Sequence, residues 1–594
     1  MTSYSSSSAF SSAASRGQAW YQQEETAANN LFGLVETIST LQGFRVAAFM
    51  RYAALYGNFD TMSWASSIYG RPVPDVRLNR VTFNIIQSMV DTVVAKHAAT
   101  QPQIEVLTEG GNWDKQVRAK KSTKLLAGEF DRLKLYRLAP LVLRDSLIFG
   151  DGYLKFYSQH NKVHVERVFP GEIIIDEADA INGQPRQAFQ VRFIDREVAK
   201  ACWPDAKFEI ETASAHELGA LAGPSTANMI KIIEAWHLPS APGAKDGKHA
   251  IVINNKTLVY EDWQYDCFPF CRISWSPAMQ GWYGQGLADQ LMGIQLELNK
   301  LLRRVQLSMH LMSVPYYLVE VGSKITKTHL NNEVGHIVEY LGSKPEARVN
   351  QSVHPEVFEQ IERLFSRAYE LAGISPLEAQ AKKPVGLDSR PALAEYADIA
   401  SERHAFFSMS WQEFFRDCSW QIFRCCSEIH SETGEYKTRG VNKKVLEPLK
   451  WSDCELENDD YTFKLSAANL LPTTPAGKKN FVQDLTQAGV FTPDQALRLL
   501  QFPDIEAITG EMTAAEDDID WCIYKLLVEG EYTPPEPFQD IQKAIKRVTA
   551  EYLKARQAGA SEDRLELLRM FLRDCTALMP PAAPPGPPGP PVGP

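Results

Sequence analysis

The chain has 594 residues, and at roughly 150 residues per domain this length predicts about four packed units. Its composition, 44% hydrophobic and 23% charged, is ordinary for a globular protein, and no apolar run reaches the ~18 to 20 residues of a membrane span. The formal net charge of -11 argues against a protein that grips nucleic acid over a broad basic surface, because neutralising phosphates requires clustered Lys and Arg. The net charge does not exclude a protein past which DNA slides without being held.

Both ends of the sequence are biased in composition. Residues 1–16 are rich in Ser and Ala and lack the basic start and apolar block of a secretion signal, so we expect a disordered arm without export. Residues 580–594 form a Pro/Gly tail that we expect to be mobile.

Residues 17–285 are predicted to begin α-rich and to continue β-rich. Apolar residues recur at helical spacing in Asn84–Ala98 and again within Lys120–Phe149. Between Gly152 and Pro277, short β-branched and aromatic runs alternate with turn residues, which is typical of strands. The predicted strands are Tyr153–Tyr157, Val163–Phe169, Ile173–Asp176, Phe189–Ile194, Ile230–His237, Ala250–Ile253 and Phe270–Trp275.

Two matching apolar seams follow. In residues 286–312 the seam positions step by four and three, which predicts a helix of about 26 residues, or ~39 Å. Its members are Leu287, Leu291, Ile294, Leu298, Leu301 and Val305. Residues 354–373, opened by Pro355, repeat the spacing with Val357, Ile361, Leu364, Ala368 and Leu371. The two helices are predicted to run antiparallel.

A small β module is predicted between the two helices, in residues 313–353. Its strand-like runs are Tyr316–Val321, His336–Leu341 and Ala347–Val353. After the second helix, residues 374–390 form a loop with two Pro, one Gly and the pair Lys382-Lys383.

The last third of the chain is predicted to be helical. Pro391 opens a segment that is free of further Gly and Pro through Thr433, and the aromatic load of residues 391–433 indicates a central packing helix. Shorter helices are predicted in residues 475–579, at Ala476–Gln487, Pro493–Leu500, Ala514–Glu529, Phe538–Ala558 and Glu562–Leu578.

Motifs for phosphate or metal chemistry are missing or incomplete. No G-x-x-x-x-G-K-[ST] phosphate cradle is present. The stretch Gly281-Trp-Tyr-Gly-Gln-Gly286 lacks a preceding βαβ unit, so we favour a helix-opening turn over a phosphate loop. Cys267-x-x-x-Cys271 has no second ligand pair at zinc-finger spacing, and the nine cysteines are interpreted as reduced thiols.

One acidic run could be imagined as a nuclease cluster. It comprises Glu516, Asp517, Asp518 and Asp520. So dense a run near a helix start is more often a solvated face that complements the helix dipole. We therefore predict no catalytic residue, no metal site and no cofactor, and a protein that is not an enzyme.

Two local patterns resemble the phage portal (head-to-tail connector) family. Trp282-Tyr-Gly-Gln-Gly-Leu-Ala-Asp-Gln-Leu291, running into Gln295-Leu-Glu-Leu-Asn299, is similar to the start of the family's first stem helix. Ala372-Gly-Ile-Ser-Pro376, through Lys383-Pro-Val-Gly386 to Ala392-Leu-Ala-Glu-Tyr396, is similar to the family's loop after the second stem helix. A weaker third match places an early helix before Gln101-Pro-Gln-Ile-Glu-Val106, so that the resemblance covers nearly the whole chain.

The resemblance implies an α+β, mostly helical subunit with a wing, a helical stem, a β-rich clip and a C-terminal helical crown. Mapped onto this sequence, the parts are wing 17–285, stem helices 286–312 and 354–373, clip 313–353, tunnel loop 374–390, returning wing helix and wing end 391–474, and crown 475–579. It also implies a ring of usually twelve identical chains at one capsid vertex, assembled in the host cytoplasm, through which double-stranded DNA is packaged and ejected. The implied partners are the major capsid protein, the terminase large subunit and a head-tail adaptor, with no membrane.

Two surfaces follow from this mapping. The loop cations Lys382, Lys383 and Arg390 are predicted to make transient, sequence-independent phosphate contacts, although they would also suit an ordinary solvated loop. In the clip, Tyr316, Tyr317 and Tyr340 either face neighbouring subunits, the motor and the adaptor, or fill the small clip core.

Two rivals remain open at this point. Another structural virion protein, such as a tail or baseplate component, could share the length and acidity. We would not expect such a protein to contain twin helices around a β insertion. A nucleic-acid enzyme without a recognisable motif is the second rival, and metal-dependent cleavage or nucleotide hydrolysis by the purified protein would support it.

Overall fold

The computed structural model describes residues 19–57, 83–108, 113–213, 228–254, 256–313, 316–318, 321, 346–348, 354–374, 405–442, 445–454, 461–466, 482–483, 485–487 and 503–579. This part mixes helix and strand with helix predominant, which confirms the α+β class. The chain divides into two compact units. The first comprises Met1–Ala98, Arg137–Phe156 and Val165–Phe414, and the second comprises Ala99–Tyr136, Tyr157–His164 and Phe415–Pro594.

The first unit opens with helices. They are α1 (Glu24–Leu41), α2 (Gly43–Gly57), α4 (Ile85–Ala98) and α6 (Leu135–Phe149, whose first two residues belong to the second unit). The helix predicted at residues 84–98 is therefore confirmed as α4. The apolar pattern predicted from residue 120 to residue 149 is broken at Lys134, whose φ of 53° is left-handed, so that it forms parts of two helices.

A five-stranded antiparallel sheet in the order β4-β5-β6-β7-β8 is central to the first unit, and a smaller sheet has the order β3-β2-β9. The strands are β2 (Asp151–Gln159), β3 (Lys162–Val168), β4 (Ile173–Ile174), β5 (Gln187–Asp195), β6 (Met229–His237), β7 (Lys248–Ile253), β8 (Lys256–Asp262) and β9 (Phe270–Ser274). All seven strands predicted in this stretch are present. The sequence missed β8, an edge strand without a buried residue to mark its period, and the short helices α7 (Arg196–Cys202) and α8 (Lys207–Thr212).

Helix α1 covers one face of the five-stranded sheet. Its apolar positions Leu31, Val35 and Ile38 are buried against strand residues that include Phe189 and Ile233. Their spacing of four and three residues places them on one side of the helix, which is the pattern of an amphipathic helix on a sheet. Helix α1 and the five-stranded sheet thus share one hydrophobic core.

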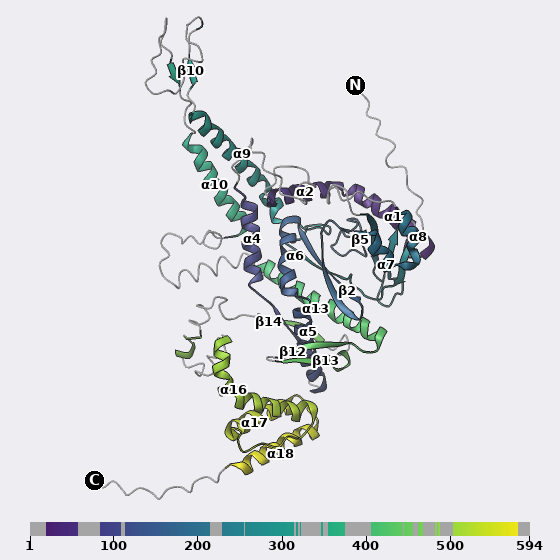
Figure 1. Ribbon diagram of the computed structural model, residues 1–594, viewed down its shortest axis with the longest axis vertical. Coiled ribbons are helices and arrows are strands. Elements are labelled where there is room, and N and C mark those ends of the chain that lie inside the picture. Colours follow the sequence, from purple (N-terminus) through teal and green to yellow (C-terminus); the bar gives the residue numbers. More distant parts are fainter. Residues whose placement is uncertain are drawn as a thin grey trace, which may run out of the picture. The chain divides into compact units, whose positions relative to one another are not determined.

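A long helical hairpin leaves this sheet layer. Helices α9 (Leu287–Ser313) and α10 (Pro355–Ala372) lie side by side and run antiparallel, as predicted (Figure 1). Strands β10 (Tyr316–Leu318) and β11 (Glu346–Arg348) pair antiparallel between them, so the first and third strands predicted here exist in shortened form. The predicted strand His336–Leu341 lies outside the described residues.

The second unit contains helix α5 (Trp113–Arg132), most of helix α13 (Ala405–Thr433) and two small sheets. Strand β1 (Gln103–Thr108) pairs with β14 (Tyr461–Ser466), and β12 (Lys437–Asn442) pairs with β13 (Val445–Lys450). A Cβ built on Gly128 of α5 would lie 1.9 Å from the Arg439 carbonyl oxygen, so only glycine allows α5 to approach β12 this closely.

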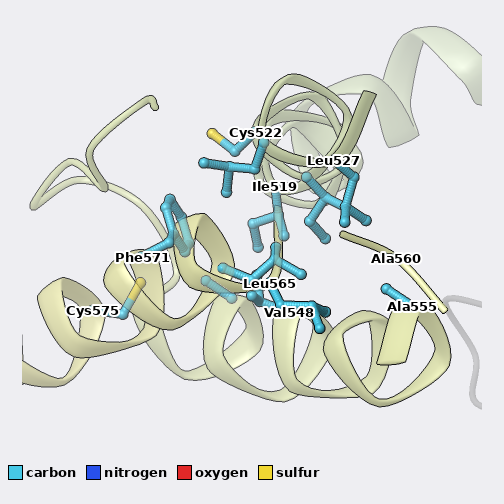
Figure 2. Packing of buried hydrophobic residues seen from close by; sticks show 13 residues of the cluster. Ile519, Cys522, Leu527, Val548, Ala555, Ala560, Leu565, Phe571 and Cys575 are labelled. Carbon is cyan, nitrogen blue, oxygen red and sulfur yellow. The ribbon is translucent and has the colours of Figure 1, made fainter. Parts of the chain in front are cut away.

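The C-terminal helices of the second unit form a core of their own. They are α16 (Pro503–Tyr524), the π-helical segment η6 (Lys525–Glu529), α17 (Ile541–Gln557) and α18 (Glu562–Leu578). Figure 2 shows Ile519, Val548, Leu565 and Phe571 meeting between these helices. The helices predicted at the same places are confirmed, whereas 476–487 and 493–500 fall mostly or wholly outside the described residues, as do 1–16 and 580–594. Within the described helices, none combines the length and the apolar character needed to cross a bilayer.

Candidate functional site

The base of the hairpin is held by a buried carboxylate, Asp151, at the start of β2. Its side chain accepts hydrogen bonds from Arg272 Nε at 2.9 Å, from the hydroxyl of Ser274, and from the Gly284 backbone N–H at 2.9 Å, and it forms an ion pair with Arg272 Nη2 at 2.8 Å. Only 3% of Asp151 is exposed. Because Gly284 lies in the turn that opens α9, this one carboxylate joins the first helix of the hairpin to strands β2 and β9.

The guanidinium of Arg272 is enclosed on its other side by the same turn. It lies 4.1 Å from the ring centroid of Trp282 and also donates to the Trp282 carbonyl oxygen. Trp282 Nε1 in turn donates to the Tyr153 hydroxyl at 3.0 Å. Burial alone would lower the pKa of Arg272, but the Asp151 carboxylate raises it above its usual value, so the cation is retained.

Glycines let the turn approach the end of α6 and the chain just after β9. A Cβ on Gly286 would lie 2.9 Å from the carbonyl oxygens of Ile148 and Leu147, and one on Gly284 would lie 2.9 Å from that of Ser276. Helix α9 begins directly after the turn, at Leu287. The helix-opening turn predicted from the sequence is therefore present, and its glycines serve close packing.

Tyr283, between Trp282 and Gly284, ties the turn to α2 and to the residue that follows β4. Its hydroxyl accepts from the Ile175 N–H at 2.8 Å and donates to Gln42 Oε1 at 3.1 Å. The guanidinium of Arg45 lies 3.6 Å from the centre of the Tyr283 ring. Burial raises the pKa of Tyr283, so the phenol stays neutral as a hydrogen-bonding group.

Further along α9, Gln295 closes the N-terminus of α4. Its Oε1 accepts from the Ile85 N–H at 2.8 Å, and its Nε2 donates to the Phe83 carbonyl at 2.6 Å and to Asn299 Oδ1 at 3.0 Å. The Gln-x-x-x-Asn pair noted in the sequence is thus a cap for a second helix. It satisfies an N–H group that the first turn of α4 leaves without an intrahelical partner.

The predicted seam of α9 faces inward. Leu287, Leu291, Leu298, Leu301 and Val305 are buried, and Ile294 is half-buried.

On α10 the inward face differs from the prediction at one position. Ile361, Leu364 and Ala368 are buried and Val357 is half-buried. Leu371, however, is 56% exposed and Ala372 is buried in its place, so placing Leu371 in the seam was wrong. Ala368 and Ala372, four residues apart, both lie on the inward face of α10.

The outer sides of the hairpin carry charges of both signs together with several large apolar side chains. Lys300, Arg303 and Arg304 of α9 are exposed, as are Glu359 and Glu362 of α10. The exposed large apolar side chains include Leu296, Leu307, Met309, Phe358 and Leu371. Within the part of the chain that the structure describes, these apolar side chains are exposed.

A buried polar network that the sequence did not reveal joins the two sheets of the first unit. Lys155 of β2 donates to Glu234 of β6, and His249 of β7 contacts Glu234 Oε1 at 3.0 Å and Glu261 Oε1 at 2.6 Å. Burial alone would raise the pKa of Glu234, but Lys155 and His249 lower it to about 2. Burial alone would lower the pKa of His249, but the two glutamates raise it. The network is a structural tie whose charges compensate one another.

The remaining predicted site residues are placed as follows. Lys382, Lys383, Arg390 and Tyr340 lie outside the described residues. Tyr316 and Tyr317 lie in β10, paired with Arg348 and Ala347 of β11.

The acidic run of α16 meets α17. Arg547 contacts Asp520 at 2.9 Å and Glu516 at 3.7 Å, and Gln539 donates to Asp518 at 2.6 Å. These carboxylates have protein partners. Among the described residues, no three His, Cys, Asp or Glu side chains gather in a way that could hold a metal ion.

Comparison with known proteins gives one family. Residues 242–391 match the family model described as phage SU10 portal protein. The matched stretch is less than half of the chain, and it contains Arg272, Gly284 and both helices of the hairpin. No curated protein matches the chain.

Proposed function

Starting from the family match, which supports a bacteriophage portal protein, we propose that the chain is one subunit of a portal ring at a capsid vertex. The observation that carries the proposal is the antiparallel hairpin with its anchored base, because this is the part of the molecule that the match covers. Portal proteins are structural, non-enzymatic components of the virion capsid. The role proposed is therefore a channel for packaging and ejection of double-stranded DNA.

The parts of the subunit are proposed by resemblance to the portal family, with the hairpin as the reference point. Helices α9 and α10 are assigned to the stem, residues 313–353 to the clip and residues 374–390 to the tunnel loop. The sheets and helices before α9, with α13 after the loop, are assigned to the wing. The C-terminal helices α16, α17 and α18 are assigned to the crown.

The exposed apolar side chains of the hairpin support ring formation. In a ring every contact joins two different faces of the subunit, so each stem helix must pack against its hairpin partner and also against a neighbouring chain. The inward seam serves the first contact. Leu296, Leu307 and Phe358 lie outside that seam and are proposed to serve the second.

The mixed charge of the hairpin suits passage of DNA. A stem of ~39 Å would enclose on the order of 23 phosphate charges, and a uniformly basic wall would hold them. Exposed Glu359 and Glu362 beside Lys300 and Arg303 give a wall of both signs. Lys382, Lys383 and Arg390 are proposed to make the transient phosphate contacts.

Partner surfaces are assigned by analogy with the family. The clip, including Tyr316, Tyr317 and Tyr340, is proposed to meet the terminase motor during packaging and the head-tail adaptor afterwards. The wing is proposed to meet the major capsid protein. Twelve subunits are the proposed ring number.

A charge placed in the proposed subunit contact tests the assignment. Leu307→Glu should lower the fraction of protein in rings by about tenfold or more, because burying an unpaired carboxylate in an interface is costly. Leu553→Glu on α17 is the matched control, since Leu553 is 53% exposed and Leu307 is 52% exposed. The measurement is size-exclusion chromatography with light scattering.

Equal ring formation by both variants would show that the outer face of α9 is not a subunit contact.

For the loop, the double variant Lys382→Glu, Lys383→Glu should reduce the amount of DNA packaged per particle. Packaging at the wild-type level would contradict the proposed phosphate contacts.

A further inference from the structure

The second unit has a pocket of its own, apart from the hairpin. A cavity of about 260 Å³ opens between α5, the end of α16 with η6, and α17. Its apolar lining includes Val117 and Trp113 of α5 and Ile523, Leu527 and Val528 on the other side. The volume lies below the ~300–1,000 Å³ of small-molecule sites, so it fits one or two apolar side chains better than a whole ligand.

The backbone beside the pocket is unusual. Residues Lys525–Glu529 form a π-helical turn that ends at Gly530, whose φ is 76°. Leu527 and Val528 of this turn line the cavity. π-Helical turns within α-helices are rare and occur frequently at functional sites, because they widen the helix and redirect its side chains. The π turn is thus an independent indication that the cavity binds something.

The rim of the cavity is basic in a chain that is acidic as a whole. Lys120, Lys121 and Lys124 of α5 line it. Lys120 Nζ lies 5.6 Å from the ring centroid of Trp113, and Lys124 Nζ lies 5.6 Å from that of Tyr524.

The two carboxylates at the rim already have cationic partners. Asp520 contacts Arg547 at 2.9 Å, and Glu551 contacts Lys554 at 2.7 Å. The rim as a whole is therefore positive, and a ligand that enters the apolar pocket gains by carrying acidic groups.

From these features we infer that the pocket between α5 and η6 docks an acidic peptide segment of a partner protein, with an aliphatic or aromatic side chain in the cavity and flanking carboxylates on Lys120 and Lys121. Duplex DNA fits less well, because it offers phosphates to the rim but no apolar side chain to the cavity. The inference depends on the second unit alone and is independent of the ring.

A labelled peptide tests the inference on the full-length chain. The probe contains Leu-Phe flanked on both sides by Glu and Asp, and its control has Gln and Asn at the acidic positions. Binding is followed by fluorescence anisotropy at low and physiological salt. The acidic probe should bind more tightly than the amide control, and the difference should shrink as salt is raised.

Two kinds of variant separate the rim from the cavity. The double variant Lys120→Glu, Lys121→Glu should weaken binding of the acidic probe by about tenfold or more. The double variant Lys543→Glu, Lys546→Glu on α17 should change that binding little. Val117→Trp, which fills the cavity, should weaken the binding of both the acidic probe and the amide control. Circular dichroism confirms that each variant folds, and the lysine variants test the proposal even if Val117→Trp does not fold.

Four results would overturn the inference. They are no binding of the acidic probe, binding that neither the rim nor the cavity variant changes, a duplex oligonucleotide that binds more tightly and is indifferent to Val117→Trp, and binding by isolated chains that is lost in assembled rings. The last result would mean that a second copy of the chain fills the pocket.

Discussion

Replacing Asp151 tests the anchor of the hairpin. In Asp151→Asn the charge that compensates the Arg272 guanidinium is lost, while the volume of the side chain is kept. The arginine stays enclosed by Trp282, and the amide can satisfy at most part of the donors that converge on the carboxylate. Breaking a buried pair by removing one partner costs about 3–5 kcal/mol. Because 1.4 kcal/mol is tenfold in an equilibrium constant, local opening should become more frequent by about a hundredfold or more.

Hydrogen exchange with mass spectrometry reads this opening directly. Amides in residues 282–295 should exchange much faster in Asp151→Asn, whereas those of α17 and α18 in the second unit should be unchanged. The matched control is Asp262→Asn, because Asp262 pairs with Lys248 at a largely exposed position. Asp262→Asn should lower the free energy of unfolding by less than about 1 kcal/mol. Wild-type exchange in residues 282–295 of Asp151→Asn would refute the anchoring role.

Three further changes probe other parts of the account. Gln295→Leu should uncap α4 and destabilise it by about 1 kcal/mol, seen as faster exchange at residues 85–88 and contradicted by unchanged protection there. Gly128→Ala should destabilise the second unit by about 1–3 kcal/mol in chemical unfolding, since its methyl group would meet the Arg439 carbonyl; a neutral effect would mean that α5 shifts freely. His249→Gln should lower the free energy of unfolding most at low pH. The pKa of His249 is raised in the folded state, so the stabilisation by its protonated ring is complete below the unfolded pKa of about 6.5. That stabilisation is lost as the pH rises through the folded pKa. Unfolding measured at about pH 6 and pH 9 should therefore show the difference from wild type shrinking, and a constant or growing difference would contradict this.

Local periodicity explains what the sequence could predict. The helices α4, α9 and α18 were predicted almost to the residue because their apolar side chains recur at helical spacing and their ends carry clear stop signals. The seam of α10 failed only at Leu371, because a step of three and a step of four are both helical and the sequence does not say which side the partner occupies.

Contacts between distant segments explain what the sequence could not predict. Strand β1 pairs with β14 across most of the chain length, and nothing local marks either strand as the other's partner. The same holds for the anchor, where Asp151, Arg272 and Gly284 meet through the fold. The glycines of the turn were visible in the sequence, but the carboxylate that they approach was not.

The mass and shape of the purified full-length chain test the central claim most directly. Light scattering at several concentrations, combined with negative-stain microscopy, should show rings with a central hole, near roughly 0.8 MDa if twelve chains of 66.7 kDa assemble. A stable monomer that forms no ring at high concentration would contradict the portal role, and it would redirect attention to the rival virion or enzymatic functions.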